Sequence, residues 1–138
     1  MATDKTAERG RVIGIGGVFF KSGDPDRLSG WYREQLGISG GAEGILFKWR
    51  PVETPDVEHC TVWSVFPANT RYFDPSAAPF LINYIVDDLD ALLAKLDRSG
   101  PNAEIKREDH EYGRFAWVID PDGNKIELWE PTPQPASR

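Results

Sequence analysis

A single carboxylate among aromatic side chains is the strongest candidate for chemistry in this sequence. Glu127 belongs to the segment 125–131, where polar and apolar residues alternate after a tight Asp-Pro-Asp-Gly-Asn turn at 120–124. The alternation predicts a strand whose inward face carries Glu127 and Trp129. A carboxylate placed there could accept a hydrogen bond from a ligand or act as a general base. The alternative is a structural role in which a neighbouring cation or indole N–H satisfies it.

An earlier segment repeats the pattern without the acid. Residues 61–67 show the same alternation, and both segments end in a proline, Pro67 and Pro131. When the two segments are aligned on these prolines, Trp63 takes the position of Glu127. The chain is therefore predicted to contain one small unit twice, with the carboxylate kept only in the second copy.

The aromatic residues form a second candidate site. The chain has 5 Trp residues, and each brings a large apolar area and an indole N–H that needs a partner. Strand alternation would bring Phe19, Trp63 and Trp129 onto one inward face, where they could stack on a flat aromatic or extended apolar compound. Plain core or dimer packing is the alternative. The ligand-binding candidates are Phe19, Trp49, Trp63, Leu81, Asn83, Tyr112, Arg114, Trp117 and Trp129.

Periodicity and turn signals predict the elements that must position these residues. Each half begins with a strand and continues into a helix capped by an aspartate, Asp24 in the first half and Asp87 or Asp88 in the second. The helices are predicted to stop at Gly37 and Gly100. The predicted strands span residues 12–21, 45–50, 60–66, 80–86, 115–119 and 125–129, with a weaker strand at 103–107 and a surface loop at 108–111.

The same signals predict one domain over residues 1–138. Within it we expect module one at about 12–67, a connector at 68–78, module two at about 79–131, and flexible ends at 1–10 and 132–138.

The composition argues against several kinds of partner and location. A net charge of −6 disfavours nucleic acid, because phosphate binding needs a cationic surface. No apolar run approaches the roughly 20 residues that a membrane-spanning helix requires. The single cysteine, Cys60, cannot form an intramolecular disulfide, and the polar N-terminus does not resemble a signal peptide. We therefore expect a cytoplasmic protein.

Several motifs resemble the vicinal oxygen chelate superfamily, which includes glyoxalase I, bleomycin-resistance proteins and extradiol dioxygenases. They are Trp31-Tyr32 late in the first helix, Leu36-Gly37 at its end, Val86-Asp-Asp-Leu-Asp90, and the closing Asp-Pro-Asp-Gly-Asn-x-Ile-Glu-Leu. The resemblance covers about residues 12–131. It implies an α+β fold of two βαβββ modules that form a cupped mixed sheet with the helices on its outer face. It also implies a homodimer.

Metal-dependent members of that superfamily bind a divalent ion through inward residues on the first and last strands of each module. In this chain those positions fall at Gly17, Trp63, Leu81 and Glu127, so only the last retains a ligand type. One carboxylate cannot hold zinc or iron, which need three or four N, O or S ligands. We therefore expect no metal and no other cofactor.

These observations favour a metal-free protein that binds an aromatic or polycyclic small molecule in an apolar, tryptophan-lined cup. By resemblance to the antibiotic-sequestering members, its role would be sequestration. The alternative is a lyase, isomerase or dioxygenase of the same fold that uses Glu127, with any metal completed by His59 or His110. A third reading is a structural or regulatory module with a decayed pocket. Binding is favoured over catalysis because no partner for a proton relay accompanies Glu127 in the sequence.

Overall fold

The described part of the chain folds into one mixed sheet of seven strands with two helices. This computed structural model describes residues 9–38, 44–96 and 106–132. The elements are β1 (Val12–Ser22), α1 (Pro25–Leu36), β2 (Ile45–Trp49), β3 (His59–Pro67), β4 (Phe80–Val86), α2 (Leu89–Lys95), β5 (Lys106–His110), β6 (Gly113–Ile119) and β7 (Lys125–Pro131). The predicted α+β class is confirmed.

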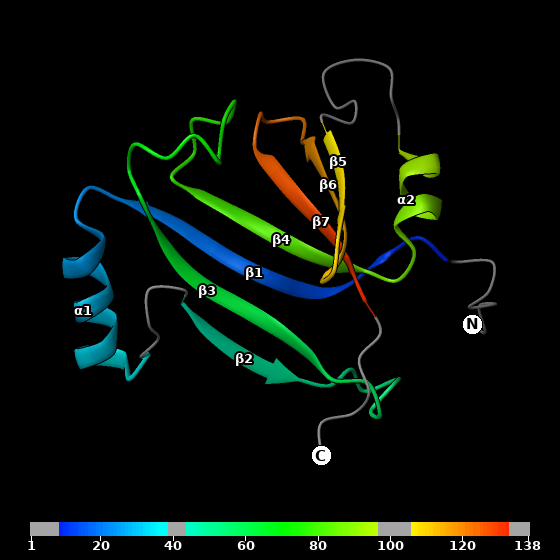
Figure 1. Cartoon of the computed structure of the whole chain (residues 1–138), viewed down its shortest axis with the longest axis horizontal. Coiled ribbons are helices and arrows are strands. Elements are labelled where there is room, and N and C mark those ends of the chain that lie inside the picture. Colours follow the sequence, from blue (N-terminus) through cyan, green and yellow to red (C-terminus); the bar gives the residue numbers. More distant parts are fainter. Residues whose placement is uncertain (1–8, 39–43, 97–105, 133–138) are drawn as a thin grey trace.

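The strand order, β2-β3-β1-β4-β7-β6-β5, is nearly symmetrical about the central β1–β4 pair. β1 and β4 are antiparallel, and each is followed outward by a parallel strand, β3 or β7. β2 and β6 continue the sheet antiparallel to these, and β5 adds one more strand on one side. We call β1, α1, β2 and β3 module one, and β4, α2, β5, β6 and β7 module two; Figure 1 shows their helices at opposite ends of the sheet.

Both helices begin as the sequence predicts. The Asp24 side chain caps α1 by accepting a hydrogen bond from the Arg27 N–H at 3.2 Å, and Gly37 ends the helix in the left-handed conformation with φ 71°. Asp88, rather than Asp87, caps α2 by accepting from the Ala91 N–H at 3.0 Å. The predicted stop at Gly100 lies outside the described residues. None of the described helices is long and apolar enough to cross a membrane.

The helices lie on the same, outer face of the sheet, but only α2 is packed into a core. Leu89 and Leu93 of α2 are buried against a cluster formed by Val86, Ala116, Val118 and Leu128. α1 has no buried residue; its Tyr32 ring lies 4.7 Å from the ring of Trp63. The helices therefore cover one side of the sheet and leave the opposite, inner face for a site.

Central strand β1 is irregular, and its glycines make room for larger side chains of neighbouring strands. The pairing of β1 with β4 shifts register between Val12 and Gly14 and between Ile15 and Gly17. A Cβ on Gly16 would lie 2.2 Å from Asn83 Oδ1, and a Cβ on Gly14 would lie 2.3 Å from the Trp49 ring. The glycines therefore let Asn83 on the inner face and Trp49 on the outer face approach the backbone.

Candidate functional site

Glu127 lies at the centre of the inner face, between Asn83 of β4 and Trp117 of β6. Direct strand pairing places both neighbours opposite it, and only 4% of the Glu127 surface is exposed. Asn83 Nδ2 donates to Glu127 Oε1 at 2.5 Å, and Trp117 Nε1 donates to Oε2 at 2.8 Å. The Tyr72 hydroxyl also donates to Oε2. Three donors thus satisfy a buried carboxylate, as the indole alternative had anticipated in part.

Tyr72 comes from the connector and was missed by the sequence analysis, which named no site residue in the predicted connector at 68–78. Its ring stacks on Phe66 with centroids 5.7 Å apart, and the neighbouring Phe73 is 0% exposed. Burial raises the pKa of Tyr72, and the charge of Glu127 raises it further. The paired aromatics Tyr72-Phe73 in an otherwise polar connector were the available signal that this segment folds back onto the sheet.

The side-chain amide of Asn83 donates to Glu127 through Nδ2, but its Oδ1 accepts no hydrogen bond from the described residues. This oxygen is buried. The atom lies over Gly16, where Ile85 and Trp129 also converge. Burying an acceptor without a partner costs free energy. The packing and the hydrogen bond that hold Nδ2 on Glu127 must therefore contribute more than this cost.

A continuous stack of aromatic rings runs beside Glu127. Phe115 stacks on Trp129 across β6 and β7 with centroids 5.7 Å apart and an interplanar angle of 6°. The same ring stacks on Trp117 with centroids 6.1 Å apart and an angle of 15°. Phe115 was not among the sequence candidates, although it alternates with Trp117 on the same strand. We call Trp117, Phe115 and Trp129 the aromatic stack.

Two pockets are lined by residues that the structure describes; the larger of these two has a volume of about 670 Å³ and lies at one end of the stack, against Trp129. Its wall is mostly apolar, and its charged residues come from the edges of both modules. The lining consists of Ile13, Leu46, Lys48, Val57, Glu58, His59, Cys60, Ile85, Val86, Asp87, Tyr112, Trp129, Glu130, Pro131 and Thr132. Of the sequence candidates, Tyr112 and Trp129 are therefore brought together here.

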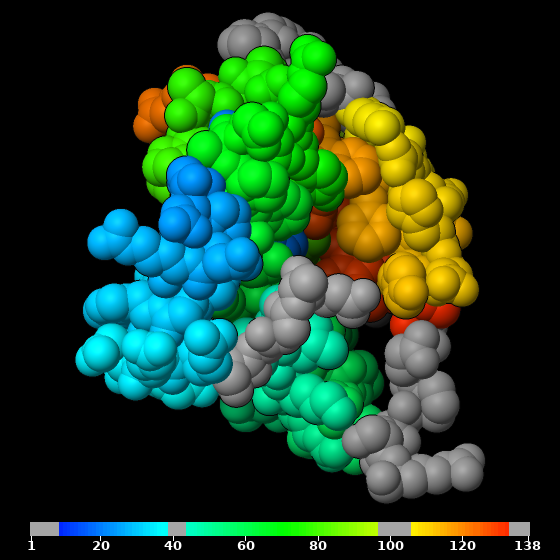
Figure 2. Space-filling model, turned by 60° about the vertical axis from the view of Figure 1, so that its left-hand side comes forward, coloured from blue at the N-terminus to red at the C-terminus, as the bar shows by residue number. Residues whose placement is uncertain are grey.

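A smaller pocket of about 420 Å³ lies at the other end of the stack, against Trp117. Figure 2 shows this hollow between the connector (green) and β5 (yellow), with β6 (orange) behind it. Its lining consists of Arg71, Tyr72, Lys106, Glu108, His110, Phe115, Trp117 and Lys125. His110 belongs to strand β5, so the surface loop predicted for 108–111 is wrong.

Three sequence candidates lie on the outer, helix-covered face and so away from both pockets. Trp63 contacts Tyr32 and Phe20, with ring centroids 4.7 and 6.1 Å apart, on the helix-covered face. The alignment on the closing prolines is therefore one residue out of register, and such a slip moves a side chain to the opposite face. Trp49 donates to Thr61 Oγ1 at 2.8 Å on that face. Arg114 Nη1 lies 2.9 Å from Asp90 Oδ2 of α2.

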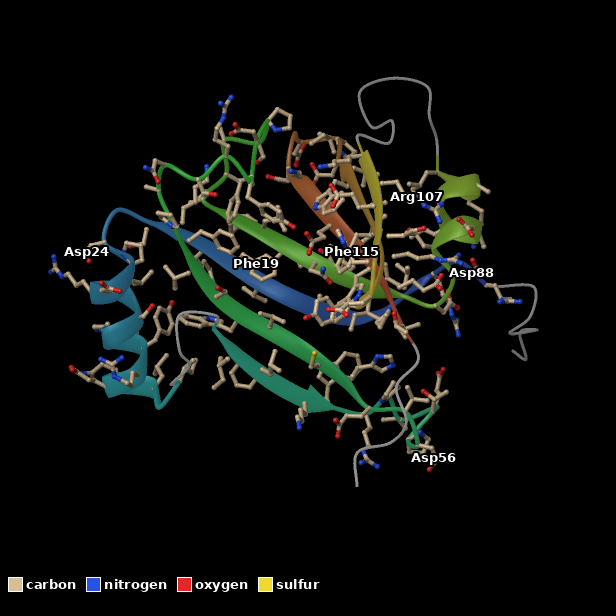
Figure 3. The ribbon with its side chains drawn as sticks, in the orientation of Figure 1. Phe19, Asp24, Asp56, Asp88, Arg107 and Phe115 are labelled. Atoms are coloured by element: carbon tan, nitrogen blue, oxygen red, sulfur yellow. The ribbon has the colours of Figure 1, made fainter. Side chains whose placement is uncertain are left out.

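The remaining candidates do lie on the inner face. Phe19 packs edge-to-face on Phe66 with centroids 5.5 Å apart. Leu81, opposite Phe19 in β4, is 1% exposed. Figure 3 places Phe19 and Phe115 near the middle of the molecule, while Asp24 and Asp88 mark the two helices at its ends.

The residues around Glu127 suit hydrogen bonding to a carboxylate rather than a metal ion. The atoms that approach its oxygens are an amide N–H, an indole N–H and a phenol O–H, and none of these donors is a common metal ligand in that form. Gly17 lies opposite Asn83 in β1 and brings no side chain. Across the described ranges, no three His, Cys, Asp or Glu side chains group in a way that could hold a metal ion.

His59 and Cys60 do not form a reactive pair. Burial raises the pKa of the Cys60 thiol, with Glu58 adding to the rise, so the thiolate is disfavoured. Burial lowers the pKa of His59, whose ring lies 5.1 Å from that of Trp49. Both residues line the larger pocket.

Solved structures share this fold over nearly the whole chain. Methylmalonyl-CoA epimerase from Mycobacterium tuberculosis has a TM-score of 0.56 at 20% identity, over 88% of this chain and 90% of the epimerase. A methylmalonyl-CoA epimerase in complex with methylmalonyl-CoA and NH4+ has a TM-score of 0.60 at 14% identity, over 92% and 100%. A glyoxalase/bleomycin resistance protein/dioxygenase superfamily member from Vibrio splendidus 12B01 has a TM-score of 0.51 at 12% identity, over 87% and 97%.

These structures define the class of fold. The chain has the vicinal oxygen chelate fold, as its helix signals and closing motif predicted. Comparisons with protein-family models and with curated protein sequences find no match.

Proposed function

We propose that this protein binds a flat aromatic small molecule in the larger pocket, with the aromatic body against Trp129. The observation that carries the proposal is an apolar pocket of about 670 Å³ bounded by one end of the aromatic stack. This volume lies within the range of known small-molecule sites, which are mostly apolar with a few polar groups at fixed positions. Planar rings gain stacking energy on an indole beyond the area that they bury.

Sequestration, as in resistance to an aromatic natural product, is the role that we propose for this pocket. Glu127 has three donors and 4% exposure, so it is committed to holding Tyr72, Asn83 and Trp117 in place. A carboxylate that is already satisfied and enclosed is a poor general base for a ligand outside it. We propose further that binding needs no metal ion, because the donors around Glu127 do not form a ligand set.

The test uses N-phenyl-1-naphthylamine, an uncharged aromatic dye that fluoresces when it leaves water. We expect saturable binding with quenching of tryptophan emission, and we expect Trp129→Leu to weaken binding by about fivefold, because one stacked ring contributes about 1 kcal/mol. Trp63→Leu is the matched control, since it removes an indole from the outer face and should leave the dissociation constant unchanged. Equal losses in the two variants, or no saturable binding to the wild type, would contradict the proposal.

An enzymatic alternative is favoured by one observation, the contact between the Tyr72 hydroxyl and Glu127. If the connector moved, these two groups could exchange a proton with a carbon acid, the chemistry suggested by the epimerases of the same fold. The test is exchange of solvent deuterium into methylmalonyl-CoA, followed by NMR. Exchange that the wild type catalyses and Glu127→Gln abolishes, in a variant that remains folded, would put this isomerase function first.

A further inference from the structure

The smaller pocket concentrates positive charge in a protein whose net charge is −6. Arg71, Lys106 and Lys125 line it, and Glu108 is the one carboxylate among its lining residues. The three cations come from the connector, β5 and β7, so only the fold brings them together. An acidic chain that gathers cations around one hollow provides a local field for an anion.

Lys125 is held over aromatic rings instead of being paired with an acid. Its Nζ lies 5.2 Å from the Tyr72 ring centroid and 6.0 Å from that of Trp117, and it donates to the Tyr72 carbonyl at 2.7 Å. Burial lowers the pKa of Lys125, whereas the charges of Glu127 and Asp74 raise it. Among the described residues, no carboxylate forms an ion pair with Lys125, so its ammonium group retains capacity for an anionic partner.

Lys106 approaches the same indole from the neighbouring strand. Its Nζ lies 5.8 Å from the Trp117 ring centroid, and it contacts Glu108. Glu108 is shared with His110, whose Nε2 lies 2.8 Å from it, and the charge of Lys106 is close enough to disfavour the charged form of Lys125. Two ammonium groups near one ring repel each other, and a bound anion between them would remove that repulsion.

Arg71 completes the rim from the opposite side of the hollow. Its side chain is 92% exposed and lies 3.5 Å from Asp74 in a surface ion pair that costs little to break. An exposed guanidinium at the mouth can turn toward a ligand and bind a carboxylate, sulfonate or phosphate through two N–H groups.

We propose that the smaller pocket recognises an anionic group of the ligand, a carboxylate, sulfonate or phosphate, while the aromatic body of the ligand lies along the stack. The geometry supports this link because Phe115 lines the smaller pocket and stacks on Trp129 of the larger one. The inference rests on the proposed function, since the stack supplies the binding of the body. It narrows the ligand class to aromatic acids.

Two dyes with the same body separate the inference from the proposed function. N-phenyl-1-naphthylamine is uncharged, and 8-anilino-1-naphthalenesulfonate adds one sulfonate. The wild type should bind the sulfonate about fivefold or more tightly than the uncharged dye, as expected for one charge-assisted contact. Added NaCl should weaken the binding of the sulfonate dye and leave the binding of the uncharged dye unchanged.

Removal of the lysines should abolish that preference. Lys106→Gln/Lys125→Gln is expected to bring the sulfonate to the affinity of the uncharged dye, whose own dissociation constant should not change. Lys95→Gln, on α2 at the outer face, removes one charge without touching the pocket and should preserve the preference. Circular dichroism of each variant checks the fold, and Arg71→Gln, a change at a 92% exposed position, provides a second, milder test.

Each outcome decides between the two ideas. A preference for the sulfonate that the lysine variants lose and Lys95→Gln keeps supports the inference. Equal binding of the two dyes, or a preference that survives in the lysine variants, overturns the inference and leaves the proposed function standing. If neither dye binds to the folded wild type, the proposed function fails and the inference falls with it.

Discussion

Module one and module two share a topology but differ in how many of their hydrophobic side chains are buried. Among the described residues, every buried hydrophobic side chain comes from Phe73 or later in the chain. Module one instead contributes most of the large hydrophobic side chains that remain exposed, among them Trp31, Leu36, Leu46, Phe47, Val52 and Val57. The difference indicates that most of the buried apolar core belongs to module two, whereas module one leaves more of its apolar side chains exposed.

The same contrast appears along one row of the inner face. Strand pairing aligns Val62, Gly17, Asn83, Glu127 and Trp117 across β3, β1, β4, β7 and β6. All the polar groups of this row belong to module two. Two copies of one topology can therefore differ in function, because a buried hydrogen-bonded group needs partners that only one copy supplies.

The largest expected effect tests where the core lies. Leu89→Ala removes a side chain that is 0% exposed and should lower the free energy of unfolding by about 2–5 kcal/mol. Leu28→Ala, in the half-buried face of α1, should cost about 1 kcal/mol or less because little apolar area is lost. Urea denaturation followed by circular dichroism measures both. Equal costs would remove the distinction between the modules.

The second prediction concerns the buried acid. Glu127→Gln replaces an acceptor oxygen with an NH₂ group that faces one of the three donors, and it should cost about 1–3 kcal/mol. Ser64→Ala, which changes a polar residue of β3 in module one, should cost less than about 0.5 kcal/mol. Denaturation midpoints of the two variants test this prediction. A Glu127→Gln variant as stable as the wild type would contradict the structural role of the carboxylate.

The third prediction uses the raised pKa of Tyr72 and concerns alkaline solution. A group with a raised folded-state pKa contributes stability below its ordinary value of 10.0 and loses that contribution as the pH rises above it. We expect Tyr72→Phe to cost about 1 kcal/mol at neutral pH through the lost hydrogen bond and to reduce the decline in stability above pH 10. Phenolate absorbance should show one tyrosine fewer resisting ionisation in the variant.

The last prediction concerns the expected homodimer and is measured as a change in mass. Phe47 and Phe80 are 44% and 42% exposed, one in each module. If the apolar surface of module one contacts a second copy, Phe47→Glu should produce a monomer, while Phe80→Glu should leave the dimer intact. Because the two side chains are exposed to a similar degree, the two changes should lower monomer stability by similar amounts, so a difference in mass between the variants reports on the contact. Light scattering after size exclusion gives the mass, and a monomeric wild type would refute the prediction.

Local signals in the sequence were sufficient for the order of elements. Asp24 and Gly37 bound α1 as predicted, and each strand predicted outside 103–107 is found within two residues at either end. Caps, turns and alternation are properties of neighbouring residues, so they can be recognised in the sequence without knowledge of the fold. The closing motif likewise predicted the vicinal oxygen chelate fold.

The sequence was less reliable for predicting which face of the sheet each strand residue lies on. Glu127 and Trp129 lie on the inner face as predicted, but Trp63 lies on the outer face because a strand reverses its faces with every residue. The register that decides this is fixed by pairing with other strands, such as Gly17 opposite Val62. Proline positions at strand ends do not determine it.

The sequence by itself determined the α+β class, the strand and helix order, and the position of one carboxylate on a strand rich in aromatics. Only the tertiary structure decided what surrounds that carboxylate: Tyr72 arrives from the connector, Asn83 from β4 and Trp117 from β6. It also gathered Arg71, Lys106 and Lys125 at one hollow. The reason is physical, because local propensities act over a few residues, whereas a site is made by side chains that are distant in the chain and meet only when the sheet curves.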